Sequence, residues 1–337
     1  MSSIPKIDLH RHLDGNIRIP TILELADWYG LKLPATTEET LRPFVTVTEP
    51  QPGLVAFLDK FKWSTSILAD EAACRRIAFE NVEDAMRERL AYVELRFSPY
   101  FMAQVHGLDV RAVIDAVVDG VRGGSELFGV KVHLIGILSR TFGVETCEQE
   151  LAAILDRRDH FVALDLAGNE ADFPARDFEP HFRKAREAGL AVTVHAGEAA
   201  GPESVWEAVD ILQAKRIGHG VRAIEDPRLI EQLRENRIGL ECCLTSNVQT
   251  STVDSYAAHP FKQFLREGLL ATLNTDDPGI SGITFDYELE IAAPQAGLSE
   301  AEIQQARQNA WEIAYLSEDE RREFLGDECG EIYRPCG

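Results

Sequence analysis

Short apolar runs rich in Val, Ile and Leu alternate along the chain with longer segments whose apolar residues recur at helical spacing. This alternation is typical of repeated βα units, in which buried parallel strands form almost continuous apolar runs. The eight apolar runs cover residues 6–9, 91–97, 132–138, 161–166, 190–194, 216–218, 238–244 and 269–273. Because eight βα repeats close a TIM barrel, the pattern predicts an α/β fold of the (β/α)8 TIM-barrel type.

The segments between these runs have helical periodicity. They cover residues 72–90, 110–128, 148–158, 180–188, 202–212, 227–236 and 260–267. The interval of about eighty residues between the first and second runs is longer than a usual βα connection. Amphipathic segments at 21–29 and 54–61 predict extra helices there above the barrel mouth, either as a lid or as a decoration that only covers apolar surface. Segments 287–293 and 301–316 predict a helical C-terminal tail outside the barrel.

The composition predicts one domain covering residues 1–337. With 45% hydrophobic side chains in 337 residues, the chain can bury a single large core. The net charge of −22 argues against nucleic-acid partners, because no basic stripe is present to neutralise a phosphate backbone. We therefore expect a small substrate that is uncharged or cationic.

The cysteines and the N-terminus indicate a cytoplasmic protein. Six cysteines are scattered without CxxC spacing, which favours reduced thiols over a disulfide framework or a thiolate zinc site. Cys329 and Cys336 could bridge, although two peripheral thiols are the simpler interpretation. The first apolar stretch is too short for a signal peptide, and no segment approaches the roughly 18 apolar residues of a membrane span. We expect no membrane partner, and the sequence leaves the oligomeric state open.

A His-x-His pair ends the first predicted strand. Because side chains alternate along a strand, His10 and His12 lie on the same face and point at one spot. Such a pair can hold one metal ion through two imidazoles, although taken alone it is more often incidental.

Further titratable residues follow other predicted strands. His195 and Glu198 follow the fifth run, His219 follows the sixth, and Asp276 and Asp277 follow the eighth. Active sites of TIM barrels are built on this face. Taken singly, the histidines could be satisfied core residues and the aspartates helix N-caps. Taken together, they indicate one catalytic site.

Three imidazoles, one carboxylate and a water form a zinc shell with an exchangeable position. A zinc ion lowers the pKa of its water from about 15.7 toward 7, which makes hydroxide available at neutral pH. An aromatic amine resists attack unless an acid protonates a ring nitrogen as hydroxide arrives. We expect Glu198 to be this acid, and His219 to steer or deprotonate the water.

Five strings closely resemble the adenosine deaminases, specifically the bacterial group within the amidohydrolase superfamily. They are His-Arg-His-Leu-Asp-Gly at 10–15, Leu-Ala-Gly-Asn-Glu at 166–170, His-Ala-Gly-Glu at 195–198, Arg-Ile-Gly-His-Gly at 216–220 and Asn-Thr-Asp-Asp-Pro at 274–278. The strings span most of the chain, and their combination is far more specific than any one of them. The resemblance implies hydrolysis of adenosine, and of 2′-deoxyadenosine, to the inosine product and ammonia in purine salvage.

The resemblance also implies a role for each matching residue. It makes His10, His12, His195 and Asp276 the ligands of one zinc ion. It makes Glu198 the proton donor to purine N1, and His219 the residue that orients the hydroxide. It implies that Asp277 bonds N7, that the backbone N–H of Gly168 meets N3, and that His12 and Asp14 lie near the ribose 5′-hydroxyl. Asn169 departs from the pattern, because many relatives carry aspartate there.

Other activities remain open at this point. The fourth strand carries no lysine to bridge two metals, so we expect a single metal. The His-x-Glu and Pro-Cys-x-x-Cys patterns of cytidine-deaminase-like enzymes are absent from the sequence. Only Arg11 and Arg18 lie near the first strand, which weakens a nucleotide substrate. Adenine is the main alternative substrate, and a non-catalytic binding protein is the alternative from another class.

Overall fold

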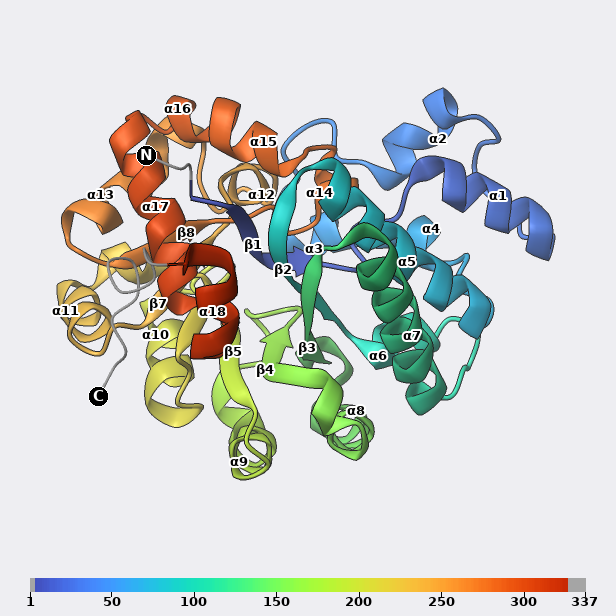
Figure 1. Cartoon of the computed structure of the whole chain (residues 1–337), viewed down its shortest axis with the longest axis horizontal. Helices are drawn as coiled ribbons and strands as arrows, with labels where there is room; N and C mark the ends of the chain where they lie inside the picture. The colour runs from blue at the N-terminus through green and yellow to red at the C-terminus, as the bar shows by residue number, and fades with distance from the viewer. Residues whose placement is uncertain (1–3, 327–337) are drawn as a thin grey trace.

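The computed structural model describes residues 4–326, and eight parallel strands form one sheet in the order β1 to β8 (Figure 1). Each strand pairs with the next one along the chain. The strands are β1 Lys6–His12, β2 Leu90–Phe97, β3 Lys131–Ser139, β4 Phe161–Ala167, β5 Ala191–Ala196, β6 Arg216–His219, β7 Gly239–Cys242 and β8 Leu270–Leu273. All eight predicted apolar runs contain a strand, so the predicted TIM barrel is confirmed.

The barrel closes where the chain leaves β8 and meets β1. The backbone N–H of His12 donates to the Asp276 carbonyl at 2.8 Å, and the N–H of Asp276 donates to the His10 carbonyl at 2.8 Å. Asp276 has a φ of 65°, a left-handed conformation that aspartate tolerates better than most residues. The same residue therefore completes the barrel and carries a carboxylate at its mouth.

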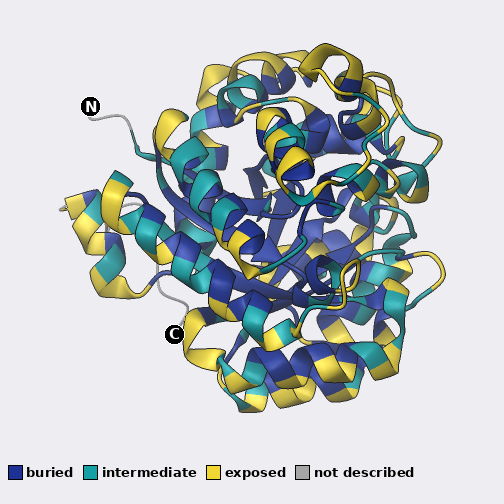
Figure 2. Cartoon of the chain, turned by 90° about the vertical axis from the view of Figure 1, so that its right-hand side faces the viewer, coloured by how far each residue is buried: buried dark blue, intermediate teal, exposed yellow. Residues whose placement is uncertain are grey.

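Helices surround the barrel and alternate with the strands. Those that follow β2 to β8 are α6 Pro99–Ala103, α7 Val110–Phe128, η1 Arg140–Phe142, α8 Val144–Asp156, η2 Arg158–His160, η3 Ala175–Phe178, α9 Glu179–Glu187, α10 Pro202–Trp206, η4 Glu207–Ile211, η5 Val221–Glu225, α11 Pro227–Glu235, α12 Leu244–Gln249, η6 Tyr256–Ala258, α13 Phe261–Arg266 and α14 Pro278–Ser281. Figure 2 shows buried residues on the strands and on the inward faces of the helices, with exposed residues on the outward faces. The apolar periodicity of the sequence thus matches the faces that the helices bury.

Five helices lie between β1 and β2, the long interval in which the sequence predicted extra helices. They are α1 Ile19–Tyr29, α2 Glu38–Val45, α3 Leu54–Leu58, α4 Phe61–Thr65 and α5 Glu71–Arg87. The predicted helix at 54–61 is divided into α3 and the start of α4 by a tight turn, in which Lys60 N–H bonds the Phe57 carbonyl at 3.0 Å. Both short helices contribute side chains to the pocket at the barrel mouth. Whether they move as a lid stays a prediction.

The predicted C-terminal helical tail is confirmed. It contains α15 Phe285–Tyr287, η7 Glu288–Ala292, α16 Ala293–Gln295, α17 Glu300–Ile313 and α18 Glu318–Leu325. Helix α17 packs on β8 and β1, where Asn309 Nδ2 donates to the Ala271 carbonyl at 2.9 Å and Trp311 is fully buried (Figure 1). The tail therefore covers the strands that close the barrel.

Some predictions are not tested by the fold. Cys329 and Cys336 lie outside the described residues, and the four described cysteines, at 74, 147, 242 and 243, are free and buried. Within residues 4–326, no helix has the length and apolar character needed to cross a membrane. The single domain over 1–337 and the cytoplasmic location stay predictions.

Candidate active site

The residues predicted for chemistry gather at the carboxyl ends of the strands. His10 and His12 lie at the end of β1, His195 lies in β5, His219 ends β6, and Asp276 follows β8. The rings of His10 and His12 have centroids 5.3 Å apart, so the alternation along β1 does bring them to one spot. Parallel strands around a barrel thus place side chains from distant parts of the sequence at one mouth.

Four donor atoms converge at this mouth. His195 Nε2 lies 3.1 Å from His10 Nε2 and 3.2 Å from His12 Nε2. Asp276 Oδ1 lies 3.2 Å from His10 Nε2 and 3.3 Å from His12 Nε2. Donors that share one zinc ion at about 2.0–2.1 Å in tetrahedral geometry lie about 3.3 Å from one another. The spacing of these four atoms therefore fits a single ion of that size.

The hydrogen bonds behind the histidines support the same conclusion. His10 Nδ1 lies 2.8 Å from Glu241 Oε2, and His195 Nδ1 lies 3.0 Å from Asp165 Oδ2. Each carboxylate accepts the Nδ1 proton, which leaves a lone pair on Nε2. Two lone pairs that face each other at 3.1 Å repel unless a cation lies between them. The donor set thus has the chemistry of a metal site.

Two buried arginines stabilise these carboxylates. Arg96 donates to Asp165 at 2.8 Å and to Glu241 at 2.7 Å, and Arg216 lies 2.6 Å from Glu241. Burial raises the pKa of Asp165, but His195 and Arg96 outweigh it and hold this pKa below its usual value. Burial likewise opposes ionisation of Glu241, while Arg216 and Arg96 hold its pKa well below the usual value. Both carboxylates are therefore ionised where they hold the histidines.

Sequence reasoning missed the roles of Arg96, Asp165 and Glu241. Their signal was visible, because each is a charged residue inside a run assigned to a buried strand. A charged group is rarely buried unless it is paired. The partners could not be assigned from the sequence, since Glu241 and His10 are 231 residues apart.

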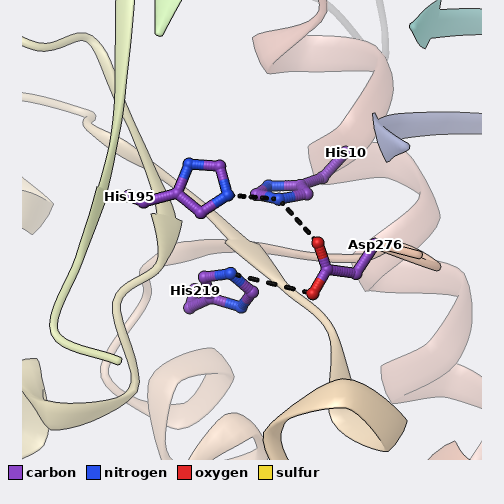
Figure 3. A group of neighbouring side chains, drawn as sticks. All are labelled: His10, His195, His219 and Asp276. Atoms are coloured by element: carbon purple, nitrogen blue, oxygen red, sulfur yellow. Dashed lines mark hydrogen bonds and ion pairs between the residues drawn. The ribbon is translucent and has the colours of Figure 1, made fainter. Parts of the chain in front are cut away.

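His219 lies beside the four donors but differs from them in its distance to Asp276 and in the partner of its Nδ1 atom. Its Nε2 is 3.9 Å from Asp276 Oδ2, the second oxygen of that carboxylate (Figure 3). His10, His195, His219 and Asp276 also satisfy the geometry of a possible metal group, as do His12, Asp276 and Asp277. The Asp276 carboxylate lies 3.9 Å from His219 Nε2 but 3.3 Å from His12 Nε2, and His219 Nδ1 contacts the amide Nδ2 of Asn247 at 3.0 Å instead of a carboxylate. The geometry favours His12 as the fourth donor.

Glu198 is the buried carboxyl group next to these donors. Its Oε2 lies 3.5 Å from His219 Nε2, and its Oε1 has no hydrogen-bond partner among the described residues. Burial, together with Asp276 and Glu170, raises the pKa of Glu198 well above its usual value. Glu170 fixes the loop itself, because its carboxylate accepts the backbone N–H groups of residues 197–200 at 2.6–3.1 Å. Burial and these neighbouring carboxylates thus favour the protonated form of Glu198, which lines the pocket.

The pocket at the barrel mouth contains the predicted substrate-binding residues. His12, Asp14, Gly168 and Asp277 all line it, opposite an apolar wall formed by Leu54, Phe57, Leu58, Phe61, Phe101 and Phe142. Among the described residues, no Lys or Arg side chain lines this pocket. It therefore suits a flat, uncharged ligand with a few polar atoms.

Two glycines are required by the shape of this pocket. Gly168 has a φ of 102°, and a Cβ atom there would lie 2.5 Å from Thr141 Oγ1. A Cβ atom on Gly15 would lie 1.7 Å from Asp277 Oδ1, an atom without a hydrogen-bond partner among the described residues. Gly168 thus holds its backbone at the ligand space, and Gly15 leaves room for the Asp277 side chain that lines the pocket.

Comparison with known proteins identifies the family. Residues 5–329 match the family model described as adenosine deaminase. The chain belongs to the adenosine deaminase family. Adenosine deaminase from Vibrio cholerae is 59% identical over 324 residues, which are 96% of this chain and 97% of that protein. The chain is therefore a hydrolase of this family of deaminases.

Two solved structures extend the comparison. Adenine deaminase from Arthrobacter aurescens has a TM-score of 0.89 and 27% identity, over 97% of this chain and 98% of that one. An amidohydrolase from Burkholderia ambifaria, solved with bound Zn, has a TM-score of 0.85 and 26% identity, over 98% of this chain and 91% of that one. The adenosine deaminase family is a family of metal-dependent amidohydrolases, and the cluster at the barrel mouth is its candidate metal centre in this chain.

Proposed function

We propose that the chain hydrolyses the 6-amino group of adenosine, and of 2′-deoxyadenosine, to give the inosine product and ammonia in purine salvage. The observation that carries the proposal is the convergence of His10, His12, His195 and Asp276 beside the buried carboxyl of Glu198. Sequence identity of 59% with adenosine deaminase from Vibrio cholerae supports the choice of substrate. The chain would act as one catalytic domain in the cytoplasm.

The four converging donors would hold one Zn²⁺ ion per chain. When bound, zinc supplies hydroxide at neutral pH, because it lowers the pKa of water from about 15.7 toward 7. Glu241 and Asp165 hold His10 and His195 with their Nε2 lone pairs toward the ion site. Strand β4 contains no lysine that could bridge a second metal, which supports one ion rather than two.

Glu198 and His219 would carry the proton chemistry of the reaction. Glu198 would protonate purine N1 while the nucleophile adds to the adjacent carbon, so that the ring nitrogen accepts the displaced electrons. The burial that keeps Glu198 protonated fits this role. His219 Nε2, 3.5 Å from Glu198 Oε2, would orient the nucleophile between the two side chains.

The remaining pocket residues would bind the rest of the nucleoside. Asp277 would hydrogen-bond N7, and the backbone N–H of Gly168 would meet N3. Asp14 and His12 would lie near the ribose 5′-hydroxyl, and His12 Nδ1 is 3.8 Å from Asp14 Oδ1. The carboxyl of Asp14 and the lack of Lys or Arg among the described pocket residues disfavour a 5′-phosphate.

Adenine is the second candidate substrate, because the adenine deaminase from Arthrobacter aurescens has the same fold with a TM-score of 0.89. The two substrates can be separated by comparing hydrolysis of adenosine and of adenine with the wild type and with Asp14→Ala. If Asp14 contacts ribose, the variant loses rate only with the nucleoside. Equal losses with both compounds would argue for adenine.

The activity itself is tested with the zinc-loaded protein and adenosine. Conversion to inosine is followed by the change in the near-ultraviolet spectrum of the purine and by release of ammonia. We expect both signals at neutral pH. An unchanged purine spectrum with one zinc bound per chain would instead indicate a protein that binds nucleosides without turnover.

A further inference from the structure

A chain of buried hydrogen bonds leads from the backbone of α13 to His219. It starts at the N–H group of Phe261, which donates to His259 Nδ1 at 3.0 Å. A backbone N–H can only donate, so His259 Nδ1 must present a lone pair. Burial lowers the pKa of His259 to about 3, so the ring is neutral and its one proton is on Nε2.

The proton on His259 determines how Asn247 is oriented. His259 Nε2 lies 3.1 Å from Asn247 Oδ1, and an Nε2–H group requires an acceptor there. The amide oxygen must therefore face His259, and the amide nitrogen must face the opposite way. The usual ambiguity between the two ends of an asparagine side chain is removed by the backbone donor at Phe261.

Asn247 in turn determines the tautomer of His219. Its Nδ2 lies 3.0 Å from His219 Nδ1, and an amide N–H group can only donate. His219 Nδ1 must then carry a lone pair, which places the ring proton on Nε2. This Nε2 faces the reaction space between Glu198 Oε2 at 3.5 Å and Asp276 Oδ2 at 3.9 Å.

We propose that Asn247 and His259 are positioning residues that hold His219 in the tautomer with its proton on Nε2, so that His219 donates a hydrogen bond into the reaction space. The catalytic role assigned here to His219 rests on the proposed function, whereas the assignment of its tautomer does not. The proposal decides between the two roles that the sequence left open for His219, steering the nucleophile and taking its proton. A histidine held with its proton on Nε2 can orient the nucleophile by donating a hydrogen bond, but this nitrogen has no lone pair with which to take a proton.

The same tautomer separates His219 from the metal ligands. His10 and His195 have Nδ1 against a carboxylate and Nε2 as a lone pair, whereas His219 has Nδ1 against an amide donor. An Nε2–H group cannot coordinate a cation. His219 therefore lies near the metal site without being a ligand, and its partner Asn247 is the reason.

The tautomer of His219 can be determined by NMR, without measuring the activity of the enzyme. Histidine is labelled with ¹⁵N in the zinc-loaded protein, and a long-range ¹H–¹⁵N spectrum distinguishes Nδ1–H from Nε2–H. The His219 signals are assigned by their loss in His219→Gln. We expect a proton on Nε2 and none on Nδ1. A proton on Nδ1 would overturn the proposal, whatever the substrate of the enzyme.

Asn247→Asp provides the matched change in chemistry. Aspartate has the shape of asparagine but accepts on both oxygens, so the His219 proton should move to Nδ1. We expect kcat for adenosine to fall at least about 100-fold, KM to change less than about threefold, and zinc content to stay at one per chain. Wild-type kcat with the proton on Nδ1 would contradict the assigned role.

Further variants distinguish positioning from folding. His259→Gln keeps an N–H donor for Asn247 and should retain more activity than His259→Leu, which has none. Asn236→Asp makes the same substitution at an exposed site on the C-terminal end of α11 and should leave kcat unchanged. Equal losses in both His259 variants would overturn the hydrogen-bond chain. If wild-type protein left adenosine intact, the proposed function would fail while the spectrum still decided the tautomer.

Discussion

Glu198 lies in a pocket whose burial and neighbouring carboxylates raise the pKa of its carboxyl well above the usual value. Only 4% of its surface is exposed, and Asp276 and Glu170 add negative charge nearby. Replacement by glutamine keeps the size of the side chain but exchanges the carboxyl for an amide, which has no transferable acidic proton. We predict that Glu198→Gln retains one zinc per chain and loses about 10²–10⁴-fold in kcat, measured by steady-state kinetics together with elemental analysis. Full activity in this variant would mean that another group donates the proton.

Asp165 would act on the proposed metal site through its contact with His195. Its carboxylate accepts the His195 Nδ1 proton at 3.0 Å and is held by Arg96. Loss of such an outer partner typically weakens metal binding by about 10–100-fold. We predict this loss of zinc affinity for Asp165→Asn, measured by competition with a chelator. Asp115→Asn, which changes an exposed aspartate paired with Arg157, serves as the control and should bind zinc like wild type.

The histidines proposed as metal ligands were predictable from local spacing, whereas the groups that support them were not. His10 and His12 share a face because side chains alternate along β1. The contact between Asp165 and Arg96 joins residues 69 apart, and it depends on β2 and β4, which lie on either side of β3, turning both side chains into the barrel. Local sequence patterns therefore show which residues share a face of one strand, whereas contacts between distant strands are visible only in the closed fold.

At the scale of elements, the strands were predictable and the inserted helices only in part. The strands of the barrel are buried on both faces, which makes each one a mostly apolar run in the sequence, interrupted by the charged residues of the site. Helix α2 was not predicted. It has only eight residues, buries only Leu41 and Val45, and contains Pro43 in its interior, a residue that argues against a helix when the sequence is read alone. Short elements that pack over a pocket take their shape from tertiary contacts more than from their own sequence.

Helices α3 and α4 provide four of the six residues of the apolar wall of the pocket, and their contribution is testable at Leu58. The Leu58 side chain lines the pocket, so removing most of it exposes a bound purine to water. We predict that Leu58→Ala raises KM for adenosine about tenfold, which corresponds to about 1.4 kcal/mol, with a smaller change in kcat. Leu127→Ala, at a site 68% exposed on α7, is the control. An unchanged KM in Leu58→Ala would show that the wall does not contact substrate.

At the scale of the whole molecule, the proposed metal site lies where the first strand of the barrel meets the residues after the last one. His10 and His12 come from the first strand and Asp276 from the residues after the last one, so an ion bound there links the two where the sheet closes. A ligand that binds only the folded state stabilises it. We predict that a chelator lowers the Tm of the wild type and that added zinc restores it. Asp276→Ala should show little change in Tm on chelation, and an equal change would contradict this link.

The central claim is that one zinc ion is held by His10, His12, His195 and Asp276, with His219 outside its coordination shell. Anomalous X-ray diffraction at the zinc edge from crystals of the zinc-loaded protein tests this claim most directly. We predict one anomalous peak at the barrel mouth, with the four donor atoms at about 2.0–2.2 Å. A peak coordinated by His219 in place of His12, or no peak at the barrel mouth, would contradict the account.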